Sequence, residues 1–177
     1  MLFGSIVLRA DGRYTNSVVG FGREIAQQYD KRQLVPFGEF IPWGFRWFVE
    51  QMQMPFSDFL AGETNQTGFT LNRQAIAVNI CFEEAFNDLL RRELPAASLL
   101  VNVSNDAWFG RSWAAAQHLQ IGQMRAAENA RWVLRATNTG MTAVINPRGE
   151  IQKQLPAFSR GVLTASVEGR QGTTPFI

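Results

Sequence analysis

The chain has 177 residues, of which 46% are hydrophobic and 18% are charged, and its formal net charge is +2. This composition is typical of a globular protein and excludes an intrinsically disordered chain. The small net charge and the scattered arginines argue against a nucleic-acid partner, because such partners are bound by concentrated basic surfaces. No apolar run is long enough to cross a bilayer. The length predicts that residues 1–177 form a single domain.

Hydrophobic patterning predicts strands that mix hairpin connections with strand–helix–strand crossovers. Strand-like runs at 2–8 and 14–19 flank the hairpin signal Asp11-Gly12, and residues 25–29 favour a third strand. Continuous apolar runs at 75–80 and 97–103 indicate interior strands that are covered on both faces. The other predictions are helices at 44–52, 84–93 and 114–130, and strands at 132–136, 142–145, 151–155 and 162–167. Together they favour a sheet-rich α/β sandwich with helices outside.

Cys81 is the only cysteine, and it stands at the end of the apolar run 75–80. Folds that alternate strands and helices place their chemistry at such strand ends. A lone cysteine cannot form a disulfide within the chain, so Cys81 is either a small core residue or a nucleophile. A nucleophilic cysteine is most often paired with histidine. The only histidine, His118, falls in the middle of a predicted helix, where we expect a helix-surface or packing role.

Lysine and glutamate offer another way to activate Cys81. A lysine stabilises the thiolate and the oxyanion, while a carboxylate moves the proton. Lys31 and Glu39 flank one short loop, and Glu83 lies just after the cysteine. Taken singly, the three are also typical of a surface lysine, a solvated loop glutamate and a glutamate at a helix N-terminus. Their residue types alone therefore leave both a structural and a catalytic interpretation open.

Three motifs that occur in order resemble the nitrilase superfamily, which uses a Glu–Lys–Cys triad. They are residues 29–39, 80–83 and 104–111. More narrowly, they look like the extracytoplasmic domain of the bacterial apolipoprotein N-acyltransferase family. Residues 138–140 and 172–176 fit the same family, so the resemblance covers nearly the whole chain. It implies a nitrilase-like α-β-β-α sandwich that is incomplete at its N-terminal end.

By this resemblance, Cys81 takes an acyl chain from a phospholipid as a thioester. It then passes the chain to the α-amine of a diacylglyceryl-cysteine at the N-terminus of an apolipoprotein. Lys31 matches the triad lysine, and Glu39 matches a second glutamate that orients it or assists proton transfer. Glu83 matches an acidic residue that supports the pocket. Phe82 replaces the tyrosine expected beside the nucleophile. The sequence contains no metal cluster, phosphate-binding glycine loop or dinucleotide fingerprint, and thioester chemistry needs no cofactor.

The resemblance also implies parts that this sequence does not contain. The triad's general-base glutamate lies upstream of the first strand in the family, and no glutamate precedes Glu24 here. The family's transmembrane helices lie upstream as well. We therefore expect the chain to be part of a longer enzyme of the bacterial inner membrane, with this domain on the periplasmic face and little acyl transfer on its own.

Aromatic side chains are concentrated in residues 37–59, where two interpretations are open. They form either a small packed core or an active-site lid that contacts the bilayer. In the second case Trp43, Trp47 and Phe48 are the expected membrane-facing set.

A second group of candidate residues lies in the motif 104–111. Trp108 and Phe109 are candidates for lining the acyl pocket, with ordinary packing as the alternative. Asn105 is a candidate support residue there, or part of a turn shaped by Asn and Asp side chains.

Two other functions use the same sequence features. A soluble amidase or nitrilase would share the triad chemistry but use water as the acceptor, although its small polar substrates need less apolar surface. A catalytically inactive module that binds lipid or a protein partner is the other alternative, and a hyper-reactive Cys81 thiol would argue against it.

Overall fold

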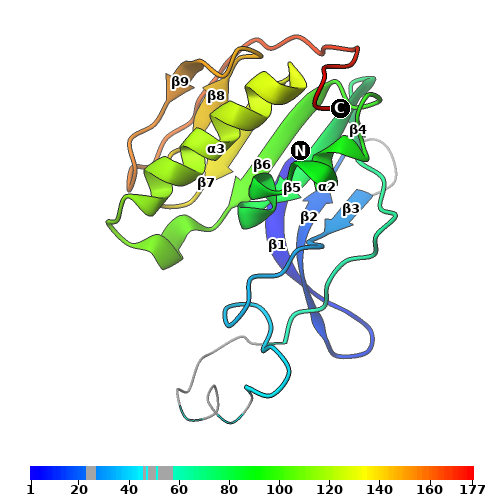
Figure 1. The fold of residues 1–177 in the computed structure, drawn as a ribbon, viewed down its shortest axis with the longest axis vertical. Coiled ribbons are helices and arrows are strands. Elements are labelled where there is room, and N and C mark those ends of the chain that lie inside the picture. The colour runs from blue at the N-terminus through cyan, green and yellow to red at the C-terminus, as the bar shows by residue number, and fades with distance from the viewer. Residues whose placement is uncertain (23–26, 46, 48–50, 52–57) are drawn as a thin grey trace.

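The computed structural model of the chain describes residues 1–22, 27–45, 47, 51 and 58–177. In these residues the strands form a smaller and a larger β-sheet (Figure 1). The smaller sheet contains β1 (Leu2–Leu8), β2 (Tyr14–Gly20) and β3 (Gln27–Asp30). The larger sheet contains β4 (Phe69–Leu71), β5 (Gln74–Ile80), β6 (Leu99–Ser104), β7 (Trp132–Thr137), β8 (Ala143–Ile145) and β9 (Ile151–Gln154). The helices are the 3₁₀ turns η1 (Cys81–Ala85) and η2 (Asp106–Phe109) and the α-helices α2 (Asn87–Arg91) and α3 (Ala114–Asn129).

The smaller sheet is antiparallel in the order β1-β2-β3, whereas the larger sheet follows the chain order from β4 to β9. Its central strands β5, β6 and β7 are parallel, and its outer strands pair antiparallel. Parallel strands end at the same edge of a sheet. The segments that follow β5 and β6, which are η1 and η2, therefore meet at one edge.

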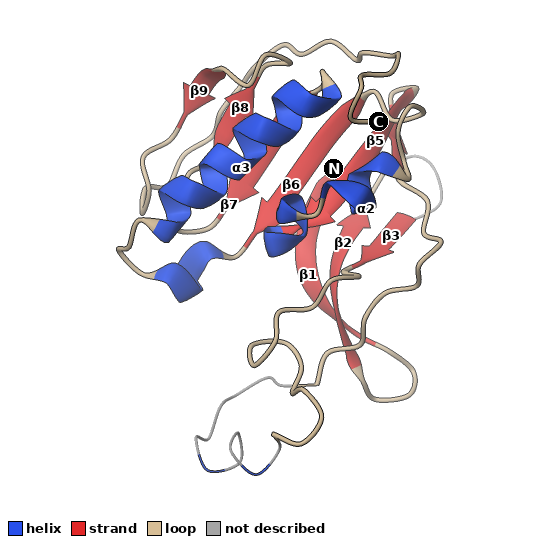
Figure 2. Cartoon of the chain, in the orientation of Figure 1, coloured by secondary structure: helices blue, strands red, loops and turns tan. Residues whose placement is uncertain are grey.

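Side chains alternate between two core layers along the central strands. Ile76, Val78 and Ile80 of β5 point toward the smaller sheet and pack with Val18 and Tyr29. Ala77 of β5, Leu100 of β6 and Val133 of β7 point the other way and pack beneath the helices, together with Leu90, Leu119 and Ala126. Figure 2 shows α2 and α3 on this second face of the larger sheet. The layers are therefore helix, sheet and sheet.

This arrangement confirms the predicted nitrilase-like α/β sandwich in incomplete form. In the part of the chain that the structure describes, no helix covers the outer face of the smaller sheet. Helix α3 forms where it was predicted because Ala115, Leu119 and Ala126 repeat on one face at helical spacing. It ends at Ala130, whose left-handed backbone (φ 49°) reverses the chain into β7.

Two predicted elements need correction: one helix is shorter than expected, and one strand is absent. The helix expected at 84–93 divides into η1 and α2 at Phe86, because the side chains of Glu83 and Glu84 are buried on different sides of the η1 turn. The strand expected at 162–167 does not form, and Val162 in it is 89% exposed, so its apolar pattern does not mark a sheet face. The short strand β4 and the turn η2 were not predicted. Most of the helix expected at 44–52 lies outside the described residues.

A buried ion pair joins the loop after β3 to the segment after α2. Arg32 Nη2 lies 3.4 Å from Glu93 Oε1 and donates to the carbonyl oxygen of Gln66 at 3.0 Å. The guanidinium also stacks on the ring of Tyr29, 5.1 Å from its centroid. Burial raises the pKa of Glu93 from 4.5 to about 7, although the charge of Arg32 opposes this.

This raised pKa of Glu93 predicts a specific pH dependence of stability. Between pH 4.5 and about 7 the folded chain holds a proton on Glu93 that the unfolded chain has released. The free energy of unfolding therefore falls as pH rises through this interval and levels off above it, by about 3 kcal/mol in total. The free energy of unfolding should be measured by urea denaturation at several pH values between 4.5 and about 7. In Glu93→Gln it should no longer fall with pH in this way. The exposed control Asp88→Asn should keep this pH dependence, and equal slopes in all three proteins would contradict the prediction.

Candidate active site

Cys81 lies on a sharp turn at the end of β5. It is the first residue of η1, and its φ of 54° puts a non-glycine residue in the left-handed region. Such a conformation costs about 1–3 kcal/mol and persists only where neighbouring contacts hold it. The side chain is partly exposed and packs at the border of the core between the sheets. A strained strand-to-helix turn with a partly exposed thiol is the geometry expected of a nucleophile.

Lys31 directly follows β3 and faces the larger sheet. It stands two residues after Tyr29, so strand alternation points both side chains in the same direction. Its ammonium is buried and lies 2.7 Å from Glu39 Oε2. Glu39 Oε2 also accepts from the Val35 N–H at 2.8 Å, and Oε1 accepts from Asn16 Nδ2 at 2.8 Å. The carboxylate is thereby fixed, and it fixes the lysine in turn. Asn16 was not among the predicted site residues.

Glu83 connects the lysine loop to the cysteine turn. Its carboxylate accepts from the backbone N–H groups of Arg32 at 2.6 Å and Gln33 at 3.0 Å. It also accepts from the Ile80 N–H at 2.8 Å and the Tyr29 hydroxyl at 3.1 Å. Because Ile80 precedes Cys81 and Arg32 follows Lys31, this one side chain fixes the two segments relative to each other.

The electrostatics of Glu83 reflect this environment. Its burial raises the pKa of the carboxyl, and the three backbone N–H donors and the charge of Lys31 oppose the rise. A carboxylate has room for about four hydrogen bonds, and here four donors occupy it. The buried group is therefore satisfied in its ionised form.

The other predicted pocket residues lie near this turn in different environments. Phe82 is exposed and packs edge-on against Phe86, with ring centroids 5.3 Å apart. Asn105 caps η2 by accepting from the Ala107 N–H at 3.1 Å, which agrees with the turn interpretation of that loop. Trp108 is 66% exposed, whereas Phe109 packs edge-on against the ring of His118.

Residues 37–45, which begin the aromatic-rich stretch 37–59 (the aromatic loop), lie below the sheets in Figure 1. Trp43 is 99% exposed and Trp47 is 64% exposed, so the interpretation of this stretch as a packed core fails for these two residues. Phe37 and Phe45 contact each other edge-on, with ring centroids 5.5 Å apart. Phe48, the third predicted membrane-facing residue, lies outside the described residues.

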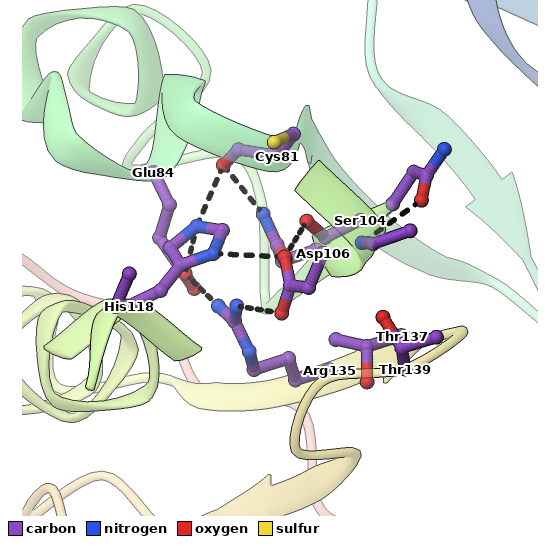
Figure 3. A network of polar contacts seen from close by, with 12 residues as sticks. Cys81, Glu84, Ser104, Asp106, His118, Arg135, Thr137 and Thr139 are labelled. Carbon is purple, nitrogen blue, oxygen red and sulfur yellow. Dashed lines mark hydrogen bonds and ion pairs between the residues drawn. The ribbon is translucent and has the colours of Figure 1, made fainter. Parts of the chain in front are cut away.

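A buried polar network on the helix side of Cys81 was not predicted (Figure 3). Arg135 forms an ion pair with Glu84 and lies 3.6 Å from Asp106 Oδ2. His118 Nδ1 lies 3.1 Å from Asp106 Oδ1, and its Nε2 lies 3.1 Å from the backbone carbonyl oxygen of Cys81. Of the two roles expected for His118, helix surface or packing, the structure shows a buried residue, and its neighbours are charged groups and the backbone of the nucleophile candidate.

Strand register brings this network together. Asn79 of β5, Asn102 of β6 and Arg135 of β7 are direct neighbours across the parallel strands and point toward the helices. Asn102 Nδ2 donates to Asn79 and, at 3.2 Å, to the carbonyl oxygen of Cys81. In the sequence, each of these three apolar strands contains a polar residue at a position that faces the core. This pattern indicates a polar network only when the register of the strands is known, because the register decides which residues are neighbours.

Opposite pKa shifts mark the two carboxyl groups of this network. Burial raises the pKa of Glu84, and Arg135 and His118 oppose the rise. Burial also acts to raise the pKa of Asp106, but the hydrogen bonds from His118 and Ser104 outweigh it, and the net direction is downward. Asp106 is therefore an ionised acceptor. Among the described residues, no group of His, Cys, Asp and Glu side chains is arranged to hold a metal ion.

Comparison with known proteins is consistent with this geometry. The sequence matches the carbon-nitrogen hydrolase family over residues 1–175. The chain belongs to this family. The apolipoprotein N-acyltransferase of Nitrosomonas europaea is 48% identical over 170 residues, which are 95% of this chain and 34% of that protein. The protein of the same name from Ralstonia nicotianae is also 48% identical, over 100% of this chain and 35% of its own length. The chain thus spans about a third of the length of these curated relatives.

A solved structure supports the fold. The carbon-nitrogen hydrolase of Helicobacter pylori G27 superposes with a TM-score of 0.66 at 18% identity, covering 87% of this chain and 56% of that one. No helix in the described part of the chain is both long and apolar enough to span a membrane.

The role of Glu83 yields a stability prediction. In Glu83→Gln, an amide NH₂ would face buried donors, and at least one of them would lose its acceptor. We expect a loss of about 3 kcal/mol in the free energy of unfolding, measured by urea denaturation. The same substitution at the exposed Glu63 should change stability by less than about 0.5 kcal/mol. Similar small losses for both variants would show that Glu83 does not hold the two segments together.

Proposed function

We propose that this chain carries the nucleophile of an N-acyltransferase that modifies lipoproteins. The observation that carries the proposal is the 48% identity, over 95% of the chain, to a protein named apolipoprotein N-acyltransferase. The strained turn at Cys81 and the buried Lys31–Glu39 pair support it. The acyl donor would be a phospholipid, and the acceptor would be the α-amine of a diacylglyceryl-cysteine at an apolipoprotein N-terminus.

The first chemical step forms a thioester. A general-base carboxylate takes the proton of the Cys81 thiol, and the thiolate attacks the ester carbonyl of the phospholipid. The C–O bond breaks, and the glycerol oxygen leaves with the proton that the carboxylate returns. The Lys31 ammonium stabilises the thiolate and the oxyanion of the tetrahedral intermediate, since a buried cation acts strongly where water is excluded. Glu39 orients Lys31 through the 2.7 Å ion pair.

The second step transfers the acyl chain. The acceptor amine attacks the thioester carbonyl, the C–S bond breaks, and the thiolate of Cys81 is regenerated while the amine loses a proton to a base. Lys31 faces the same developing oxyanion as in the first step. This two-step route needs no cofactor, because each step exchanges one acyl bond for another.

Two exposed tryptophans of the aromatic loop support a location at a lipid surface. Trp43 and Trp47 expose large amphipathic rings, and such rings bind favourably at the boundary between headgroups and acyl chains. We place the domain on the periplasmic face of the bacterial inner membrane, where phospholipid and lipoprotein substrates are both within reach.

A chimera provides the direct test of acyl transfer. This chain would replace the aligned 170 residues of the Nitrosomonas europaea relative, and transfer from labelled phospholipid to a diacylglyceryl peptide would be measured in membranes. We expect transfer by the chimera and none by its Cys81→Ala variant at equal expression. Hydrolysis of a simple amide without acyl transfer would instead favour the amidase alternative.

The reactivity of Cys81 tests the role of Lys31 in the chain itself. We expect Lys31→Ala to slow alkylation of Cys81 by iodoacetamide at neutral pH by about tenfold, because the thiolate loses a cationic neighbour. Lys153, the only other lysine, is the matched control, and Lys153→Ala should leave the rate unchanged. An equally slow or unreactive thiol in all three proteins would argue against a nucleophile prepared by Lys31.

Membrane contact can be measured by binding to liposomes of phosphatidylethanolamine and phosphatidylglycerol. Replacing Trp43 and Trp47 together by alanine should weaken the partition coefficient by roughly tenfold. Trp113 is another highly exposed tryptophan outside the loop, so Trp113→Ala is the matched control and should have little effect. Equal losses for the loop variant and the control would contradict a specific contact through the loop.

A further inference from the structure

The backbone carbonyl of Cys81 has two side-chain partners. Asn102 Nδ2 donates to it at 3.2 Å, and His118 Nε2 lies 3.1 Å from it. The orientation of this carbonyl is set by rotation about the Cα–C bond of Cys81, which together with the φ of 54° defines the left-handed turn. Contacts that fix the carbonyl therefore help to hold the turn that carries the side chain of Cys81. Figure 3 shows the dashed contacts meeting at the carbonyl oxygen, while the sulfur takes no part in them.

Both ring nitrogens of His118 face oxygen atoms that accept hydrogen bonds. Nε2 faces the carbonyl oxygen of Cys81, which cannot donate, and also lies 3.6 Å from Glu84 Oε2. Nδ1 faces Asp106 Oδ1, which already accepts from the hydroxyl of Ser104. A neutral imidazole has only one N–H and would leave one nitrogen lone pair facing another lone pair. Only the imidazolium form can donate to both partners.

The charges around the ring favour this form. Glu84 of η1, Asp106 of η2 and Arg135 of β7 are the buried charged groups that contact His118 or one another in this network. Arg135 lies beside both carboxylates and can compensate only one negative charge. With both carboxyl groups ionised, a proton on each nitrogen of His118 supplies the second positive charge, so that the buried group is neutral as a whole.

Two glycines leave space for these carboxylates. A Cβ atom on Gly122 of α3 would lie 2.9 Å from Glu84 Oε1, and one on Gly140 would collide with Asp106 Oδ2. The helix and the loop after β7 thus approach the network more closely than any other residue type allows. The contacts of His118 belong to a fitted arrangement rather than to an incidental side-chain position.

We infer that His118 is a positioning residue for Cys81, held as an imidazolium whose Nε2–H fixes the carbonyl of the nucleophile turn. The inference rests on the proposed role of Cys81 as nucleophile. His118 does not touch the thiol, so it acts through the backbone and not as the base of a Cys–His pair. Asn102 is the second donor to the same carbonyl, and Lys31 acts on the thiol from the opposite side, where the smaller sheet lies.

Because His118 is the only histidine, its protonation can be observed without assignment. Labelling the chain with ¹⁵N-histidine gives a single imidazole spectrum, whose two nitrogen shifts distinguish the imidazolium from either neutral tautomer. We expect both nitrogens to carry hydrogens in the folded protein at neutral pH. One bare nitrogen would overturn the inference, and this measurement needs no substitution that could affect folding.

Two substitutions separate positioning from general structural support. The amide nitrogen of His118→Gln can replace Nε2 and keep a donor to the Cys81 carbonyl, whereas that of His118→Asn can replace Nδ1 and reach only Asp106. We expect His118→Asn to slow alkylation of Cys81 by iodoacetamide about tenfold, and His118→Gln to stay within about threefold of the unmodified protein. Unfolding midpoints of both variants are measured alongside, and equal effects on the rate would overturn positioning through the carbonyl.

Lys31→Ala in the same series distinguishes the two proposals. If Lys31→Ala slows alkylation and His118→Asn does not, the inference on His118 fails while the nucleophile role of Cys81 stands. If neither variant changes the rate, the proposed nucleophile role itself fails, whatever the histidine spectrum shows.

Discussion

The site depends on two consecutive carboxylates that are buried on different sides of one short turn. Glu83 points toward the smaller sheet and accepts from the loop that carries Lys31, while Glu84 points toward the helices and pairs with Arg135. Burying a carboxylate is costly unless donors or cations satisfy it, so each side chain requires its own set of partners. The turn at Cys81 is therefore held from both sheet faces, and this explains how a left-handed cysteine persists there.

The two halves of the site use cations differently. On the smaller-sheet side, Lys31 and Glu39 form one pair, and the lysine lies after a strand whose neighbouring side chain, Tyr29, is part of the core. On the helix side, Arg135 and His118 meet Glu84 and Asp106, and the strands supply the scaffold through their register. Among the described residues, the first arrangement pairs the ammonium group with one carboxylate, which suits the role on a substrate oxyanion that we propose for Lys31. The second arrangement is internally matched and suits a supporting role.

The sequence predicted the parts of this site that depend on local order along the chain. Lys31, Glu39, Glu83 and Cys81 stand in motifs, and the apolar runs before Cys81 and Ser104 predicted the buried parallel strands that carry η1 and η2. The network around His118 could not be predicted in the same way, because it depends on which residues face each other across β5, β6 and β7. Asn79, Asn102 and Arg135 become neighbours only through that register. The wrong strand at 162–167 has a related cause, since alternating apolar residues indicate a strand only where a neighbouring strand can pair with them.

The distribution of aromatic and charged groups connects the site to its surroundings. Around Cys81 the side chains of Lys31, Glu83, Glu84 and Asp106 are buried, and each is held by an ion pair or by hydrogen bonds, so their positions are fixed. The tryptophans at 43, 47 and 108 are exposed, and exposed aromatic surface is costly in water unless a binding partner covers it. A small polar amide could not cover such a surface, whereas an acyl chain and the boundary of a bilayer could. The physical contrast between a rigid polar centre and exposed tryptophans at the periphery therefore agrees better with the proposed lipid substrate than with the amidase alternative.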